Sequence, residues 1–180
     1  MKIQAQSSLK HKMVELKAKV DDHTFLKEKL SGLGAEYVGS FEQTDMYYKV
    51  PEGRLKLREV NGSDSTELIY YERENIAGPK SDDAFLLRVD QAQDLKVILK
   101  KVLAPLVVVE KIREIYRLDG TQVHLDDVKG LGKFIEFERQ TADDSSELEK
   151  DRRVLDKLMN TLQIHPSSLE THSYSDLLEK

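Results

Sequence analysis

The chain of 180 residues has the length of one domain, and 39% hydrophobic with 34% charged residues indicates a modest core beneath a strongly polar surface. The formal net charge of -5 argues against a protein that binds nucleic acid non-specifically, because such proteins carry an excess of basic residues. The lack of cysteine excludes disulfides and thiolate chemistry, and no apolar run is long enough to span a membrane. We expect one domain over residues 1–180, cytoplasmic, without a nucleic-acid or membrane partner.

The first half of the chain alternates strand patterns with one helical pattern. Apolar Val14, Leu16 and Ala18 alternate with charged Glu15 and Lys17, which is typical of a strand with two unlike faces. Residues 1–12 lack periodicity and are expected to form a flexible lead-in. In order, the patterns predict a strand over 13–20, a helix over 21–34 with Asp21 or Asp22 as N-cap and Gly34 as C-cap, strands over 37–50, 54–58 and 68–73, a loop over 75–83 and a strand over 84–89.

The second half follows the same order. Asp90 is expected to cap a second helix, whose apolar positions are Leu95, Leu99 and Leu103 among others. The remaining patterns predict a strand over 106–118, a hairpin with strands over 123–128 and 134–138, a helix over 145–162 and a tail with a short apolar Leu177-Leu178 segment.

The similar order of the two halves indicates a weak internal repeat. Tyr47 corresponds to Tyr116, and the strand end Glu72-Arg73 corresponds to Glu138-Arg139. Two βαββ units that share a core favour a closed eight-stranded antiparallel β-barrel of the α+β class with pseudo-twofold symmetry and helices packed outside. Closure is favoured because it removes exposed sheet edges.

The predicted hairpin over 123–138 carries an unusual density of carboxylates. Glycines at 130 and 132 allow the tight connection, so Asp126, Glu136 and Glu138 are expected to lie close together. Hard oxygen ligands at this density suit Mg²⁺ or Mn²⁺. The alternative is an edge hairpin whose acidic residues face water. His124, near Asp126, could assist proton transfer, although a polar strand histidine is more often solvated.

The charged strand faces have to be placed relative to the helices. Amphipathic helices need an apolar sheet surface to pack on, so at least part of the barrel must turn its apolar side outward and its charged side inward. A lumen lined by both signs of charge is costly unless water, ions and a ligand fill it, and a polyanion with divalent metals fits such a lining. The alternative, for a segment such as Arg54-Leu-Lys-Leu-Arg58 alone, is a solvated strand face.

Several charged segments occur in a fixed order over residues 13–160. They are Val14-Glu-Leu-Lys-Ala18, Gln43-Thr-Asp-Met-Tyr-Tyr48, Gly53-Arg-Leu-Lys-Leu-Arg58, Leu68-Ile-Tyr-Tyr-Glu-Arg73, Lys111-Ile-Arg113, and Leu125-Asp126 followed by Phe134-Ile-Glu-Phe-Glu138. As a set they resemble the CYTH proteins, or triphosphate tunnel metalloenzymes, which include class IV adenylyl cyclases, thiamine triphosphatases and inorganic triphosphatases. The resemblance implies an eight-stranded antiparallel tunnel.

The resemblance also implies roles for individual residues. Glu15, Glu136 and Glu138 would hold Mg²⁺ or Mn²⁺, to which the hairpin pattern adds Asp126. Arg73 is expected to join the triphosphate-binding residues, although the internal repeat would instead turn Glu72 inward. The other triphosphate-binding residues implied are Lys17, Arg54, Lys56, Arg58, Lys111 and Arg113. No residue is singled out as catalytic.

Two departures from the family pattern concern the metal. Met13 stands where the family usually has the first glutamate of its N-terminal strand, and the strand over 84–89 lacks the family's glutamates, with only Asp82 and Asp83 upstream. Loss of these carboxylates weakens a second metal position more than it weakens polyphosphate binding.

The expected function is that of a metal-dependent enzyme acting on a nucleoside triphosphate or another triphosphate. The preferred hypothesis is a class IV adenylyl cyclase, which converts ATP to cyclic AMP and pyrophosphate. The alternatives are an inorganic or thiamine triphosphatase, a non-catalytic polyphosphate or nucleotide sensor, and a purely structural barrel. A homodimer would be in keeping with the family.

Overall fold

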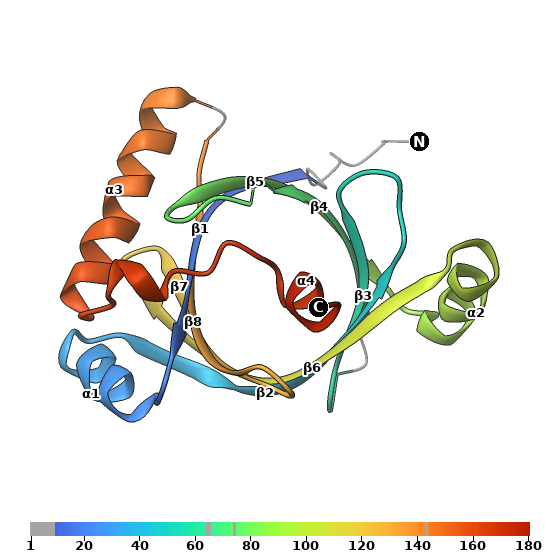
Figure 1. Ribbon diagram of the computed structural model, residues 1–180, viewed down its shortest axis with the longest axis horizontal. Helices are drawn as coiled ribbons and strands as arrows, with labels where there is room; N and C mark the ends of the chain where they lie inside the picture. Colours follow the sequence, from blue (N-terminus) through green and yellow to red (C-terminus); the bar gives the residue numbers. More distant parts are fainter. Residues whose placement is uncertain (1–9, 64–65, 74, 143) are drawn as a thin grey trace, which may run out of the picture.

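The computed structural model describes residues 10–63, 66–73, 75–142 and 144–180, and its central element is a closed antiparallel barrel (Figure 1). The order around the barrel is β1-β5-β4-β3-β2-β6-β7-β8, and β8 pairs back onto β1, as the predicted fold class requires. The strands are β1 (Lys10–Val20), β2 (Glu36–Tyr48), β3 (Arg54–Val60), β4 (Thr66–Arg73), β5 (Lys80–Val89), β6 (Pro105–Leu118), β7 (Thr121–Val128) and β8 (Gly132–Gln140).

The internal repeat is present, but each half is larger than expected. One strand precedes the helix and three follow it, which makes βαβββ rather than βαββ, and β1 lies beside β5 as β2 lies beside β6. The match of Tyr47 with Tyr116 is wrong by one residue. Tyr48 pairs with Leu55 as Tyr116 pairs with Val123, so Tyr48 is the residue of the first half that corresponds to Tyr116.

The outer face of the barrel carries the main apolar core, as expected. Val14, Leu16 and Ala18 of β1 are fully buried against outward residues of β7 and β8 and against two helices, α1 (Thr24–Gly32) and α3 (Ser145–Thr161). A smaller core forms where α2 (Ala92–Val102) packs its Leu99 against β2 and β3. The inward alternate positions are thereby left to the charged residues.

Two strands begin earlier than the sequence pattern indicated. Residues 10–12, expected in the lead-in, already belong to β1, and residues 80–83, expected in a loop, form the start of β5. The two strands pair with each other along these extensions, with Lys12 opposite Asp83 and Met13 opposite Asp82. Long-range pairing between β1 and β5 therefore makes residues 80–83 a strand, and the loop signal of Gly78-Pro79 holds only up to residue 79.

The expected helix caps are only partly correct. The first helix starts after His23, with Asp22 accepting a hydrogen bond from the backbone amide of Thr24 at 3.0 Å. The second helix starts after Gln91 instead of Asp90, and its N-terminus has no side-chain cap.

The C-terminal segment corrects the expectation that helices pack only outside. A short helix, α4 (Tyr174–Leu178), lies within the ring of strands in Figure 1. The strap leading to it, which includes a 3₁₀ turn at Pro166–Ser168, is fixed to β1 because Leu169 bridges Ala18 and the Glu170 amide donates to the Lys17 carbonyl at 2.9 Å. A capping box formed by Ser173 and Asp176 starts the helix.

Candidate active site

The barrel encloses a cavity of about 390 Å³, and half of its lining residues are charged. One part of the lining, here called the basic wall, consists of Lys56 and Arg58 of β3 and Lys111 of β6 around Asp45 of β2. The facing part, here called the acidic wall, consists of Glu15 of β1, Asp82 of β5, and Glu136 and Glu138 of β8.

The basic wall is organised by one buried carboxylate. Asp45 accepts hydrogen bonds from Lys56 at 3.1 Å, from Lys111 at 2.8 Å, and from the Nε and Nη2 atoms of Arg58 at 2.7 and 2.9 Å. Burial opposes its ionisation, but Arg58, Lys111 and Lys56 outweigh burial and hold the pKa of Asp45 well below its usual range. Three cations thus share one anion, so this wall attracts further negative charge.

Lys111 is the least solvated cation of this wall. Burial lowers its pKa to about 7 despite the neighbouring Asp45, because Arg58, Arg113 and Lys56 repel a further positive charge. Its charge near neutral pH therefore depends on whether a second anion lies nearby.

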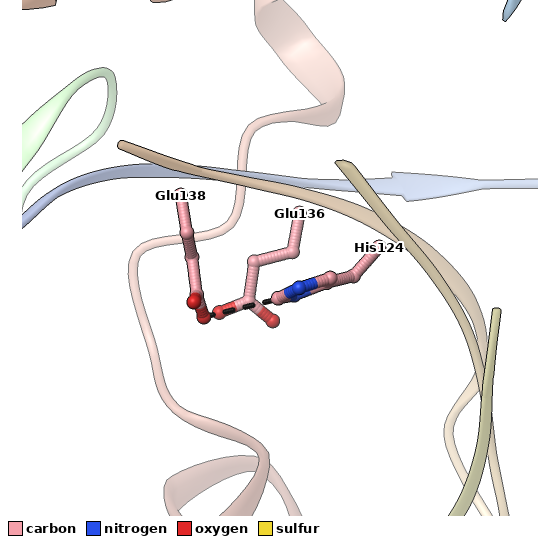
Figure 2. Close-up of side chains that lie close together, drawn as sticks. All are labelled: His124, Glu136 and Glu138. Atoms are coloured by element: carbon pink, nitrogen blue, oxygen red, sulfur yellow. Dashed lines mark ion pairs between the residues drawn. The ribbon is translucent and has the colours of Figure 1, made fainter. Parts of the chain in front are cut away.

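Two residues of the acidic wall, together with His124, form a group that fits a divalent cation. Ligand atoms of His124 on β7 and of Glu136 and Glu138 on β8 all lie within 4.8 Å of one another, and Figure 2 shows the three side chains converging from neighbouring strands. His124 lies opposite Glu136 in the β7–β8 ladder, which fixes their proximity. Among the described residues this group includes neither Glu15 nor Asp126.

The protonation states within this group differ. Burial raises the pKa of Glu138, and the charge of Glu136 raises it further, whereas Lys17 and Arg113 overcome burial and lower the pKa of Glu136. Burial, with the positive charge of Arg113 nearby, lowers the pKa of His124 to about 3, so its imidazole is neutral at physiological pH.

Asp126 lies next to this group and contacts other residues. Its two carboxylate oxygens accept hydrogen bonds from Nε and Nη2 of Arg113 at 2.7 and 2.6 Å, and the Tyr174 hydroxyl donates to it at 2.8 Å. Nη2 of Arg113 also reaches Glu136 at 3.0 Å. The hairpin therefore does bring Asp126 near Glu136, with a guanidinium between them.

The adjacent strands β1 and β5 supply the other two acidic residues of this wall, Glu15 and Asp82. Glu15 forms a buried ion pair with Arg73, and Arg73 lines the cavity. Arg73 therefore points into the barrel, and the internal repeat, which predicted that Glu72 would point inward, is wrong at this position. Asp82 lies opposite Met13 in the ladder, and burial together with the charges of Glu15 and Glu138 raises the pKa of Asp82 to about 8. The position expected to lack a carboxylate therefore has one on the neighbouring strand.

Arg54 and Lys17 meet the C-terminal segment. Arg54 forms an ion pair with Asp176 at 2.7 Å, and it lies outside the lining of the main cavity. The Nζ atom of Lys17 lies 4.1 Å from the centre of the Tyr174 ring, a cation–π geometry. The remaining predicted cations, Lys56, Arg58, Arg73, Lys111 and Arg113, all line the cavity.

Apolar and aromatic side chains complete the cavity lining. The hydroxyl groups of Tyr47 and Tyr71 form a hydrogen bond at 3.4 Å, and both rings lie near Lys56. The apolar lining residues on the neighbouring strands β4 and β5 are Ile69, Ala84 and Leu86. The cavity can therefore accept a group that is not a phosphate.

Four residues of this site are absent from the metal-binding and triphosphate-binding sets predicted from the sequence. Asp45 shares its face with Tyr47, a parity that could have placed it inside, and His124 shares its face with Asp126. Asp82 was assigned to a loop, and nothing in the tail pattern placed Tyr174 inside the barrel.

The CYTH domain family matches residues 11–174 of the chain, which covers all eight strands except the first residue of β1. The chain belongs to the CYTH domain family. CYTH proteins bind triphosphate substrates, generally depend on metal ions, and include adenylyl cyclases and triphosphatases. The enclosed cavity with its basic and acidic walls is the tunnel of this family in the present chain.

Relatives of the chain share the full length of this fold. A Methanocaldococcus jannaschii protein named "Putative adenylate cyclase" is 28% identical and aligns with 91% of this chain and 97% of its own length. The solved PH1012 protein of Pyrococcus horikoshii superposes with a TM-score of 0.82 at 24% identity, covering 92% of this chain and 98% of that one. A Hippeastrum protein, whose structure title states a dominant triphosphatase activity, superposes with a TM-score of 0.67 at 15% identity over 93% of each chain.

No helix in the described part of the chain has the length and apolar character needed to cross a membrane.

Proposed function

We propose that this chain is a divalent-metal-dependent enzyme that binds a nucleoside triphosphate in its tunnel and acts as a class IV adenylyl cyclase, converting ATP to cyclic AMP and pyrophosphate. The observation that carries the proposal is the opposed pair of walls: three cations share one carboxylate on one side, and clustered carboxylates lie on the other. A triphosphate with its metal ion supplies the charges that both walls lack.

The triphosphate is bound by the cations of the lumen. Lys56, Arg58 and Lys111 hold phosphoryl oxygens in place of Asp45, and the planar Arg58 fork suits two oxygens at once. The other proposed binding residues are Lys17, Arg73 and Arg113 of the lumen, and Arg54, which lies outside the cavity lining. Arg73, Arg113 and Arg54 are paired internally with Glu15, Asp126 and Asp176, so substrate binding exchanges one anion for another.

The metal is held by carboxylates of the acidic wall. Glu136 and Glu138 offer oxygen donors close together, which fits Mg²⁺ or Mn²⁺. Glu15 and Asp126 become available when Arg73 and Arg113 turn to the phosphates. When bound, the cation neutralises charge on the phosphoryl oxygens and lowers the pKa of the attacking oxygen.

The reaction is an in-line displacement at the α-phosphorus. The ribose 3′-oxygen attacks, the bond from the α-phosphorus to the oxygen that bridges it to the β-phosphorus breaks, the hydroxyl proton is released, and pyrophosphate leaves. Arg58 and Lys111 stabilise the charge that develops on the leaving group, since buried cations cost no reorganisation during the reaction.

The aromatic and apolar lining favours an organic triphosphate over tripolyphosphate. An inorganic chain has no apolar surface to bury against Ile69, Leu86 and the ring of Tyr71, whereas a nucleoside has. The second candidate is a triphosphatase, in which water attacks the terminal phosphorus, and the activity stated for the Hippeastrum protein of the same fold supports it.

A substrate panel tests the proposal. The purified chain is incubated with ATP, thiamine triphosphate or tripolyphosphate, in Mg²⁺ or Mn²⁺, and cyclic nucleotide, pyrophosphate and orthophosphate are measured separately. The cyclase predicts cyclic AMP and pyrophosphate in equal amounts from ATP. Release of orthophosphate without cyclic AMP would reject the cyclase and support the triphosphatase. Tight binding without turnover of any of the three substrates would contradict the proposal that the chain is an enzyme.

A further inference from the structure

His124 is buried beside Glu136 and Glu138 of the acidic wall, and one of its ring nitrogens has no hydrogen-bond partner among the described residues. Only 3% of its side chain is exposed, and its Nδ1 atom has no hydrogen-bond partner. A buried polar atom without a partner costs free energy that folding does not recover, so such an atom indicates a contact supplied by something else.

The other ring nitrogen is already engaged. Nε2 of His124 lies 3.4 Å from Oε1 of Gln122, two residues earlier on the same face of β7. In the tautomer that makes this contact a hydrogen bond, the proton is on Nε2 and the lone pair is on Nδ1. Histidines that bind metals in proteins are held in this way, with the second nitrogen donating to a neighbouring acceptor.

The lone pair of Nδ1 faces a carboxylate. Nδ1 lies 3.7 Å from Oε1 of Glu138, which is too long for a hydrogen bond and places two acceptors face to face. Glu136 completes the group, and because Arg113 and Tyr174 both contact its Oε2 atom, Oε1 is the oxygen left for another partner. Three donor atoms from two strands therefore surround one point (Figure 2).

We propose that Nδ1 of His124 is a ligand of the tunnel cation, beside Glu136 and Glu138, and that this nitrogen makes the site select a first-row transition ion such as Mn²⁺ over Mg²⁺. Mg²⁺ prefers oxygen ligands in octahedral geometry and keeps several waters, whereas imidazole nitrogen strengthens binding of first-row transition ions. The inference rests on the proposed function only in taking the tunnel to hold a divalent cation.

Direct metal binding tests this without turnover. The full chain, stripped of metal, is titrated with Mn²⁺ by electron paramagnetic resonance, and Mg²⁺ is then added as competitor. The electron spin echo envelope of the wild-type Mn²⁺ complex should show modulation from a coordinated ¹⁴N nucleus. This measurement needs no variant. In His124→Asn, this modulation should disappear, the Mn²⁺ affinity should fall about 10- to 100-fold, and the Mg²⁺ affinity should change less than about threefold.

His11→Ala is the matched control, because it removes an imidazole from the cavity lining and leaves the group of three ligands intact. It should leave the nitrogen modulation and the Mn²⁺ affinity unchanged. A Mn²⁺ complex without ¹⁴N modulation, modulation that persists in His124→Asn, or an unchanged preference for Mn²⁺ over Mg²⁺ in that variant would each overturn the inference. If instead the nitrogen signal is present while ATP is not turned over, the proposed function fails and the metal ligand stands.

Discussion

The two walls of the tunnel differ in how their charges are compensated. On the basic wall every cation already contacts Asp45, and one carboxylate serves three of them. On the acidic wall, Asp82 and Glu138 form no ion pair with Lys or Arg among the described residues, and the pKa of each is raised by burial and by neighbouring carboxylates. The basic wall thus favours a bound anion and the acidic wall a bound cation. Substitutions in the basic wall should therefore affect triphosphate affinity, and substitutions in the acidic wall should affect metal-dependent turnover.

The largest effect is expected on turnover, from the acidic wall. Glu136→Gln removes a charged metal donor without changing shape, and it should lower kcat about 10²- to 10³-fold, since metal stabilisation of the reacting phosphoryl group is worth several kcal/mol. Triphosphate affinity without metal should stay within about threefold, measured by calorimetry. Glu110→Gln, at an exposed ion pair with Lys129, is the control and should leave both quantities unchanged. A variant that loses affinity and turnover together would erase the distinction between the walls.

The basic wall should show the opposite separation. Arg58→Ala removes a two-point contact, so triphosphate affinity should fall about 10- to 100-fold, as expected for one or two charged hydrogen bonds. Metal affinity measured with Mn²⁺ alone should not change. Lys129→Ala, on the outside of the barrel, controls for the loss of a positive charge. Equal affinities in Arg58→Ala and Lys129→Ala would contradict a phosphate-binding role for this wall.

The position of the walls was predictable, and their exact composition was not. The alternation of Leu16 with Lys17, and of Leu57 with Lys56 and Arg58, predicted both faces of the barrel because three amphipathic helices needed an apolar surface. Asp82 was missed because its pairing with β1 is a long-range contact that a local turn signal conceals. His124 was undervalued because alternation cannot distinguish a face turned to a lumen from one turned to solvent.

The pH dependence of binding distinguishes Lys111 from its neighbours. Its pKa is lowered to about 7, so it loses its proton as pH rises through neutrality, and triphosphate affinity should fall by up to about tenfold between pH 6 and pH 8. Binding at pH 8 should take up a proton, which calorimetry in buffers of different ionisation enthalpy detects. Lys111→Arg keeps the charge and should flatten the profile; an unchanged profile would assign the titration to the ligand.

The smallest expected effect is a gain. Asp45→Asn removes the carboxylate that competes with the triphosphate, so affinity should rise about three- to tenfold. The same change leaves buried cations unpaired, and it should lower the melting temperature of the free protein by about 5–15 °C. Tripolyphosphate should then restore more stability to this variant than to the wild type in thermal unfolding. Weaker binding by Asp45→Asn would mean that Asp45 positions the cations and does not compete with the ligand.

The claim that the two walls complete each other through one ligand is tested most directly by anomalous diffraction from crystals grown with Mn²⁺ and a non-reacting ATP analogue. We predict a manganese peak between Glu136, Glu138 and His124. The phosphoryl oxygens of the analogue should contact Lys56, Arg58 and Lys111, and at least one of them should also contact the ion. Manganese on the outer surface, or phosphates bound away from these three cations while Asp45 keeps its contacts, would contradict the account.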